Sequence, residues 1–248
     1  MNDILKIKNL KKIYHTNNGE TLAVEDFSFN LKDGEFIAIV GPSGCGKSTI
    51  LSILCGLEDK SSGTIELVNN STIGYMLQQD SLFEWRNILN NCLLGLEINN
   101  TLNEKTKNHV IELLSTYGLK DFIYSYPDNL SGGMRQRVAL IRTLAPNPTL
   151  LLLDEPFSAL DYQSRLSISN DIYNILKKEK KSMIMVTHDI AEAISMCDKV
   201  IVLSNRPATI KNIYEIKLEN KGTPLENRKD KRFNYYYDAI WKDIDFNV

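Results

Sequence analysis

The sequence predicts an α/β fold, and three observations point to that class. Short apolar runs, such as 36–40 and 150–153, alternate with longer stretches that carry apolar residues at helical spacing. A glycine-rich turn lies directly between the run 36–40 and one of these helical stretches, and two acidic residues end the run 150–153. Strands that alternate with helices build a sheet whose ligands bind at the strand ends, and the last two features belong at that edge.

The composition is that of an ordinary folded protein. Of the 248 residues, 43% are hydrophobic and 24% are charged, which suits a single core with an inserted subdomain. The net charge of −2 gives no reason to expect nucleic-acid binding. The four cysteines lack the spacing of a zinc site or a disulfide framework. No secretion signal opens the chain, and no apolar run approaches the roughly 18 residues of a membrane span. We therefore expect a soluble protein that reaches a membrane only through a partner.

The expected elements follow from apolar spacing and from turn residues such as Asn17-Asn18-Gly19 and Lys32-Asp33-Gly34. Strands are expected at 4–8, 22–31, 35–40, 64–68, 73–77, 150–153, 183–187 and 199–203. Helices are expected at 50–54, over much of 87–144, and around 165–178 and 190–196.

Two regions outside the alternation have patterns of their own. Within 87–144, a capping box from Thr101 to Glu104 is expected to open one helix, and Tyr126-Pro127-Asp128-Asn129 to separate it from the next. The mixed-charge stretch 220–232 is expected to be a linker or solvated loop, followed by an aromatic helix near 235–241.

The glycine-rich turn consists of Gly41, Pro42, Ser43, Gly44, Cys45, Gly46, Lys47, Ser48 and Thr49. It has the pattern of a phosphate-binding loop, in which two glycines separated by four residues precede Lys and Ser. Glycine lets the backbone wrap closely around an anion, and N–H groups at the start of the next helix point at the phosphates. Lys47 is expected to reach the β- and γ-phosphates, and Ser48 to ligate Mg²⁺. A turn that only connects a strand to a helix would not need this pattern, so we expect a nucleoside triphosphate to bind.

The acidic pair Asp154-Glu155 is the expected partner of a phosphate loop. A carboxylate at the end of an inner strand can hold Mg²⁺ directly or through water, and we assign this role to Asp154. Glu155 points differently and is expected to accept a proton from the attacking water. The alternative is that the two acids merely end the strand.

A second anion site is predicted where Ser131 precedes Gly132 and Gly133 in the stretch 130–137. Serine caps a helix start, and paired glycines expose its first N–H groups. An ordinary capped helix would explain the serine but not both glycines. With Ser158-Ala159-Leu160-Asp161 and Thr187-His188-Asp189, these motifs resemble the ATP-binding subunit of ABC transporters over nearly the whole chain.

The resemblance implies a fold and a division of the chain. The fold would be a P-loop NTPase (RecA-like) core with an N-terminal antiparallel β subdomain and an inserted helical subdomain. The nucleotide-binding core would comprise 1–86 and 145–219, the helical signature subdomain 87–144, and a C-terminal linker and helix 220–248. Two copies would pair head to tail, so that the signature of one meets the γ-phosphate bound by the other.

The resemblance also assigns roles to single residues, with ATP and Mg²⁺ as cofactors. Gln78, or its neighbour Gln79, would sense Mg²⁺ and the γ-phosphate, and His188 would contact the γ-phosphate. Asp161 would cross the dimer interface. Tyr14 would stack on adenine, although a strand aromatic in the core is the alternative. Glu155, His188, Lys47 and Gln78 are therefore the expected catalytic residues, and Ser48, Gln78 and Asp154 the expected metal ligands.

Two further stretches suggest a subgroup and its partners. Residues 81–86 and Ser204-Asn205-Arg206-Pro207 resemble the nitrate/sulfonate/taurine importers, although Glu84 stands where proline is usual. Importers of the thiamine precursor hydroxymethylpyrimidine, and soluble ATPases of iron–sulfur assembly, remain the alternatives. We expect a homodimer on permease subunits at the cytoplasmic face of the membrane, indirectly served by a solute-binding protein and without nucleic acid. Leu82 to Trp85 would combine docking to the permease with core packing, and Lys177 to Lys181 would be a solvated helix end.

Overall fold

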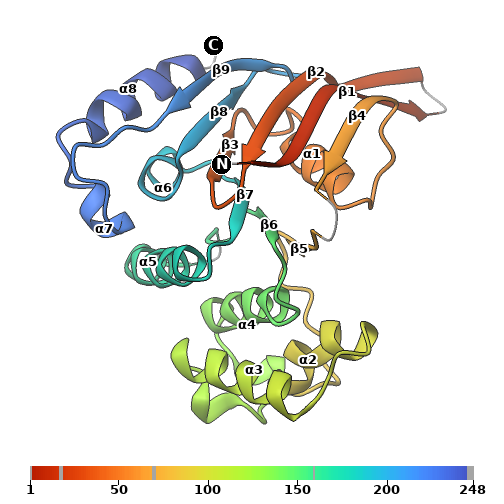
Figure 1. Ribbon diagram of the computed structural model, residues 1–248, viewed down its shortest axis with the longest axis vertical. Helices are drawn as coiled ribbons and strands as arrows, with labels where there is room; N and C mark the ends of the chain where they lie inside the picture. The colour runs from red at the N-terminus through yellow and green to blue at the C-terminus, as the bar shows by residue number, and fades with distance from the viewer. Residues whose placement is uncertain (1, 17–18, 69–70, 159, 245–248) are drawn as a thin grey trace.

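Two β-sheets and a group of helices make up the computed structural model, which describes residues 2–16, 19–68, 71–158 and 160–244 (Figure 1). The predicted α/β class is confirmed. The predicted turn at 17–19 lies largely outside the described residues. Within the described ranges, no helix combines the length and the apolarity that a membrane crossing needs.

The smaller sheet is antiparallel and has the strand order β2-β1-β4. Its strands are β1 (Asp3–Thr16), β2 (Gly19–Lys32) and β4 (Ser62–Leu67), and β1 pairs with both neighbours. β1 runs well past the expected strand 4–8. Ile7 and Leu10 are buried between polar neighbours, so this sheet has one covered face.

The larger sheet has the order β5-β6-β7-β3-β8-β9. The strands are β5 (Ile73–Met76), β6 (Leu150–Asp154), β7 (Ser182–Val186), β3 (Phe36–Val40), β8 (Lys199–Leu203) and β9 (Ile210–Glu215). All run parallel except β9, an antiparallel edge strand that the sequence pattern did not reveal. Every residue of β3, β6 and β7 is buried, because both faces of the sheet are covered.

Alternate residues of the central strands enter two different cores. From β3, Phe36, Ala38 and Val40 pack with helices, including α4 (Gly132–Leu144), α5 (Tyr162–Lys178) and α6 (Ile190–Met196). Ile37 and Ile39 pack on the other side with α1 (Lys47–Leu54) and the antiparallel sheet. The parallel sheet is therefore the middle layer of the molecule.

The helical subdomain contains α2 (Ile88–Ile98), α3 (Glu104–Thr116) and α4 (Gly132–Leu144), which lie together at the end of the molecule away from the antiparallel sheet (Figure 1). Short 3₁₀ turns at Lys120–Phe122 and Pro127–Asn129 separate α3 from α4. The predicted capping box at Thr101–Glu104 is wrong. Asn103 caps α3 together with Thr106, because the helix begins at Glu104, two residues later than a cap at Thr101 would place it.

The C-terminal region is more ordered than its composition suggests. A helical turn, α7 (Pro224–Asn227), interrupts the stretch expected to be a solvated loop, and α8 (Phe233–Ile244) follows. Asn227 is fully buried, and its Nδ2 donates to the carbonyl oxygen of Ser195 at 2.7 Å. The expected solvated helix end at 177–181 is also wrong in part, because Lys177 contacts the Phe36 ring and Lys181 is buried against Asn147.

Candidate functional site

The candidate site lies where four neighbouring parallel strands end. The order β5-β6-β7-β3 brings together the segments that follow these strands. Gln78 follows β5, Glu155 follows β6, His188 follows β7, and the phosphate loop follows β3. Residues that are more than a hundred positions apart therefore meet at the carboxyl edge of one sheet, where such folds bind ligands.

The phosphate loop requires its glycines. Gly44 and Gly46 have φ values of 72° and 128°, a region that residues with a Cβ rarely adopt. A Cβ on Gly46 would lie 3.0 Å from the carbonyl oxygen of Ala23, on the neighbouring antiparallel sheet. The phosphate loop therefore lies so close to β2 that position 46 leaves little room for a side chain.

The loop ends at the start of α1, and no side chain caps this helix. Uncapped N–H groups and the positive end of the helix dipole make the start of α1 suited to an anion. The side chain of Lys47 is buried, and its Nζ donates to the carbonyl oxygens of Gly41 at 2.8 Å and Pro42 at 2.9 Å. The ammonium group is therefore held inside the loop, beside the helix start.

A cavity of about 300 Å³ opens over this loop. It is lined by Ser43, Gly44, Gly46, Lys47, Ser48, Thr49, Gln78, Glu155 and Arg206. The structure thus brings together most of the predicted loop residues with two of the predicted catalytic residues. Arg206 was not among the predicted site residues. Its Nη2 donates to the carbonyl oxygen of Gly44 at 2.7 Å. The only sequence signal was its place in the stretch 204–207, which we interpreted as a subgroup feature.

Asp154 and Ser48 form the part of the site that suits Mg²⁺. Asp154 is 4% exposed, and its Oδ1 has no hydrogen-bond partner among the described atoms. Burial raises the pKa of Asp154, whereas hydrogen bonding to Ser48 opposes the shift. Among the residues that the structure describes, no three His, Cys, Asp or Glu side chains gather into a metal cluster. Mg²⁺ commonly takes only one or two protein carboxylates, with phosphate and water oxygens completing its shell, so a buried carboxylate with one unpartnered oxygen beside a hydroxyl fits it.

Tyr75 is a second residue that the sequence did not single out. Burial and the nearby charge of Asp154 raise the pKa of Tyr75 to about 12. Tyr75 lies on β5 opposite Leu152 of β6, two residues before Asp154. Only the register of this strand pair reveals the contact.

Glu155 is the centre of the candidate catalytic group. Its Oε2 lies 3.2 Å from Nε2 of Gln78, which donates to it, and 3.3 Å from Nδ1 of His188. The backbone of Glu155 has a φ of 47°, which is unusual for a residue other than glycine, and its N–H donates to the carbonyl oxygen of Val186. Strained backbone of this kind is common where a functional side chain must be aimed, and here it turns the carboxylate toward the cavity.

The two adjacent glutamines share one cavity, but only one of them also lines the cavity over the phosphate loop. Gln78 lines the cavity over the phosphate loop. Both Gln78 and Gln79 line a second cavity of about 480 Å³, together with Asp80, Ser81, Leu82, Glu84, Arg135 and Gln136. Because only Gln78 reaches both cavities and bonds to Glu155, the geometry favours Gln78 over Gln79 as the sensing residue.

Other predicted residues lie apart from the phosphate loop of the same chain. Ser131 is exposed and caps α4, and a Cβ on Gly132 would meet open space. A Cβ on Gly133 would lie 2.9 Å from the Leu160 side chain. Asp161 caps α5, and hydrogen bonding to Ser164 lowers its pKa. These residues do not line the cavity over the loop.

Tyr14, the predicted adenine-stacking residue, also lies outside that lining. It is half-buried on β1, and the Nζ of Lys12 lies 4.7 Å from the centre of its ring. The ring is therefore partly packed against the core and partly accessible.

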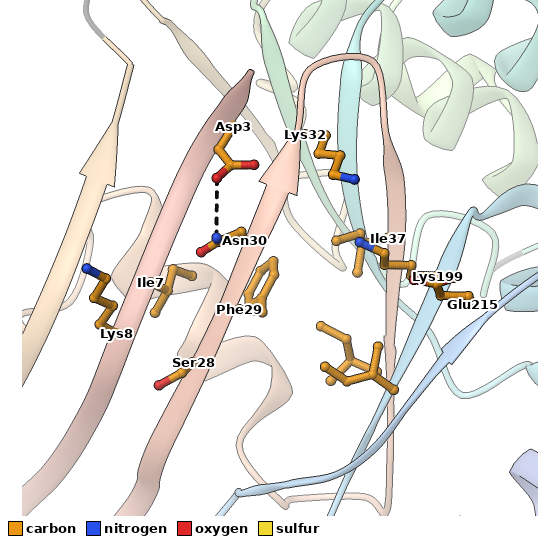
Figure 2. A pocket seen from close by; sticks show the side chains of 12 residues that line it. Asp3, Ile7, Lys8, Ser28, Phe29, Asn30, Lys32, Ile37, Lys199 and Glu215 are labelled. Atoms are coloured by element: carbon orange, nitrogen blue, oxygen red, sulfur yellow. Dashed lines mark hydrogen bonds between the residues drawn. The ribbon is translucent and has the colours of Figure 1, made fainter. Parts of the chain in front are cut away.

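A larger cavity lies elsewhere and has a different character. Figure 2 shows this space of about 570 Å³ between β1 and β2 on one side and β3, β8 and β9 on the other. It opens at the starts of β3 and β8, opposite the phosphate-loop edge. Much of its polar rim is paired: Asp3 with Asn30, Lys199 with Glu35, and Glu215 with Lys217. We therefore assign the chemistry to the smaller cavity.

Known proteins resemble this chain over nearly its full length. The family description "ABC transporter" matches residues 24–158. The chain is 46% identical to the uncharacterized ABC transporter ATP-binding protein YtlC of Bacillus subtilis (strain 168), with 97% of this chain and 95% of the relative covered. The nitrate import ATP-binding protein of Synechocystis is 34% identical over 95% and 93% of the two chains. The taurine import ATP-binding protein of Pelagibacter ubique is 37% identical over 94% and 90%.

A solved structure with a similar fold carries a nucleotide. It is the dimeric structure of a post-hydrolysis state of an ATP-binding cassette bound to ADP and Pi. Its TM-score is 0.78 at 29% identity, and the match covers 86% of this chain and 99% of that chain.

Proposed function

This chain belongs to the ABC transporter family as an ATP-binding and ATP-hydrolysing subunit, and from that premise we propose that it works as a head-to-tail pair driving uptake of a small solute. One observation carries the pairing. The phosphate loop and Glu155 share one cavity, whereas the exposed turn at Ser131 is built for an anion but lines no part of that cavity. A second copy of the chain would bring its own Ser131 turn to the open side of the bound nucleotide.

Within one half of the site, the phosphate loop and Lys47 bind the nucleotide. The two carbonyl oxygens that now accept hydrogen bonds from Lys47 are neutral. Phosphate oxygens are charged and form stronger bonds with an ammonium group, so ATP would draw Nζ away from Gly41 and Pro42. Arg206 sits beside the same loop and adds a second positive charge. ATP binding would therefore exchange internal loop contacts for contacts to the ligand.

Ser48, Asp154 and Gln78 would hold Mg²⁺ beside the phosphates. When bound, this ion neutralises developing negative charge on the phosphate oxygens. Tyr75 lies close to the Asp154 carboxylate and would help to orient it. The unpartnered Oδ1 of Asp154 would coordinate Mg²⁺ directly or accept a hydrogen bond from a water on the ion.

Glu155 orients and deprotonates the attacking water. Its carboxylate faces the cavity, and the hydrogen bond from Gln78 holds it in place. As the water oxygen bonds to the γ-phosphorus, the bond from that phosphorus to the oxygen bridging the β- and γ-phosphates breaks, which releases ADP and phosphate, and Glu155 accepts the proton of the water. His188, 59% exposed, is free to turn from Glu155 toward the γ-phosphate and stabilise charge there.

An exposed aromatic pair supports docking to a membrane subunit. Phe83 and Trp85 are stacked with ring centres 4.8 Å apart, and Trp85 is 75% exposed. Tyr124 is also exposed, and the carbonyl oxygen of the next residue, Ser125, accepts a hydrogen bond from the backbone N–H of Ile88 at the start of α2. Leu82, in contrast, is buried in the core, so this segment packs inward through Leu82 and leaves Trp85 exposed for a partner. An exposed aromatic patch suits a helix of a permease, which would place the chain at the cytoplasmic face of the membrane.

The relatives named for nitrate and taurine import support a small solute of the nitrate, sulfonate or taurine type as cargo. Hydroxymethylpyrimidine import is the second candidate, since those ATPases resemble the same subgroup. Identification of the ligand retained by the associated solute-binding protein separates these candidates. Co-purification with soluble assembly proteins in place of a permease would instead favour iron–sulfur assembly.

The variant Glu155→Gln tests the catalytic assignment. It keeps the hydrogen-bonding shape but removes the base, so we expect ATP turnover to fall by about 100- to 10,000-fold. ATP binding should persist, and the pair should accumulate in a nucleotide-locked form, measured by gel filtration with ATP. Turnover near that of the unchanged protein would contradict the role of Glu155.

A further inference from the structure

The signature helix α4 grips the segment that follows Gln78. Arg135 of α4 makes a two-pronged contact with Asp80: its Nε donates to Oδ2 at 2.9 Å and its Nη2 to Oδ1 at 3.2 Å. The same Nη2 donates to Oε1 of Glu84 at 2.8 Å. One further arginine, Arg142, donates to the carbonyl oxygens of Ser81 at 2.7 Å and Asp80 at 2.5 Å. We call the contacts of Arg135 with Asp80 and Glu84 the α4 clamp.

The α4 clamp is built to stay ionised. Burial opposes ionisation of Asp80, but hydrogen bonding from Arg135 holds the pKa of this carboxyl below its ordinary value. Hydrogen bonding to Asp80 in turn raises the pKa of Arg135. The two side chains are 24% and 22% exposed, so solvent screens them only in part. Forked arginine–carboxylate pairs of this kind fix relative orientation as well as distance.

The α4 clamp lies between two functional segments of one chain. At one end, Arg135 is a helical turn beyond Ser131, and its N–H donates to the carbonyl oxygen of that residue at 2.9 Å. At the other end, Asp80 is two residues beyond Gln78, which bonds to Glu155. A continuous series of bonded groups therefore runs from the signature turn to the catalytic carboxylate.

Apolar packing already joins the helices of this subdomain. Cys92 and Leu93 of α2 are buried with Val138 and Ile141 of α4. The α4 clamp adds polar contacts to the segment 80–84, which connects the core to those helices and whose Leu82 is buried in the same core. Its contacts are therefore additional to those that hold the subdomain together.

We propose that Arg135 is a positioning residue that couples the two nucleotide sites of the pair through Asp80. This inference rests on the proposed function, in which the Ser131 turn contacts the nucleotide of the partner subunit. Binding there shifts α4, and the α4 clamp transfers the shift to the segment after Gln78, which adjusts the hydrogen bond on Glu155. ATP binding at one nucleotide site thus affects the other site through contacts within a single chain. The coupling free energy is reciprocal, because each site changes the other by the same amount.

The test is the dependence of ATP turnover on ATP concentration, with the full chain assembled on its permease. For two coupled sites the Hill coefficient exceeds 1 and is at most about 2. Asp80→Asn keeps the side-chain shape but weakens the α4 clamp, so the coefficient should fall toward 1. Glu97→Gln is the matched control. Glu97 pairs with Arg86 at 2.8 Å in the same subdomain, with similar exposures of 34% and 29%, and its loss should leave the coefficient unchanged.

Arg135→Lys supplies a second, conservative variant should Asp80→Asn fail to fold. Lysine keeps the positive charge but cannot make the two-pronged contact with Asp80. The Hill coefficient of Arg135→Lys should therefore lie between 1 and that of the unchanged protein. The proposal is overturned by a Hill coefficient of 1 in the unchanged protein, by an unchanged coefficient in the folded clamp variants, or by an equal fall in Glu97→Gln. Absence of any ATP turnover in the unchanged protein would contradict the proposed function instead.

Discussion

Glu192 shows how one buried side chain makes the stability of the molecule depend on pH. It lies on α6, is 3% exposed, and accepts a hydrogen bond from the hydroxyl of Thr187 at 2.9 Å. Nε of Arg165 is 3.6 Å from its other oxygen. Burial, and then the charge of Asp189, raise the pKa of Glu192 to about 7. Thr187 directly precedes His188, so the carboxyl of Glu192 is hydrogen-bonded to the residue next to a candidate catalytic side chain.

The sign of the pH effect follows from where the proton is held more tightly. The folded chain keeps the Glu192 proton up to about pH 7, whereas the unfolded chain loses it near the ordinary value of 4.5. The free energy of unfolding therefore falls as the pH rises through this window. Relative to Glu192→Gln, the unchanged protein should lose about 2 to 3 kcal/mol between about pH 5 and about pH 8. Urea unfolding of both proteins at the two pH values measures this, and a constant difference would contradict the prediction.

Single residues also mark the limit of the sequence prediction. The phosphate loop and the acidic pair could be predicted because their chemistry depends on neighbours along the chain. Tyr75 could not, because its contact with Asp154 depends on the register between β5 and β6. Arg206 could not, because it reaches Gly44 from a turn that enters an unpredicted edge strand.

At the scale of elements, the segment between β5 and α2 carries the exposed aromatic pair described above. Phe83 and Trp85 are stacked, and Glu84 between them is held by the α4 clamp. The segment is thus an ordered surface rather than a solvated loop, with one side of it fixed to α4. A partner that binds the aromatics would bind next to Gln78.

We predict that Trp85→Ala weakens binding of the permease by roughly 30-fold, since buried interface tryptophans commonly contribute about 2 kcal/mol. ATP turnover by the chain without its permease should change little, because Trp85 lies outside the catalytic cavity. Trp241→Ala is the matched control: Trp241 is 50% exposed and stacked on Tyr237, but lies on α8. Quantitative pull-down in detergent measures both, and equal losses would contradict a specific docking surface.

Element boundaries were harder to predict than element types. The helix after residue 100 was expected, but its cap is Asn103 because that side chain, and not Thr101, meets the free N–H of Thr106. The helical turn α7 was missed because its charged surroundings resemble a loop. Its order comes from Asn227, whose amide bonds to α6 across the fold. Such tertiary contacts leave no local pattern in the sequence.

At the scale of the whole molecule, the separation of the Ser131 turn from the phosphate loop gives the pair a specific arrangement. In a head-to-tail pair, each nucleotide contacts the loop of one chain and the signature of the other. Closed two-fold symmetry then creates two equal sites from two incomplete halves. This arrangement differs from a pair in which each chain carries its own complete site.

Mixing two inactive variants tests the arrangement. In a mixed pair of Lys47→Ala and Ser131→Arg, both changes fall in one site and the other site is intact. Random pairing gives half mixed pairs with one working site each, so we expect ATP turnover of up to about a quarter of the unchanged protein. Each variant alone should be inactive, which serves as the control. No recovery on mixing, with pair formation verified by gel filtration, would favour complete sites within single chains.

Alternate residues of β3 enter two different cores. A change in the length of this strand is therefore tolerated less well than a change in its residue types. Exchanging Ile37 for Val would trim one core by a single methylene, a change that cores tolerate. Deleting Ile37 would instead make Phe36 and Ala38 neighbours, so that with Phe36 in place Ala38 and the residues after it would turn to the opposite layer, because strand side chains alternate strictly. The same deletion would rotate the phosphate loop to face away from Glu155. We therefore expect natural variation in this strand to consist of substitutions, with insertions and deletions displaced into the surface turns.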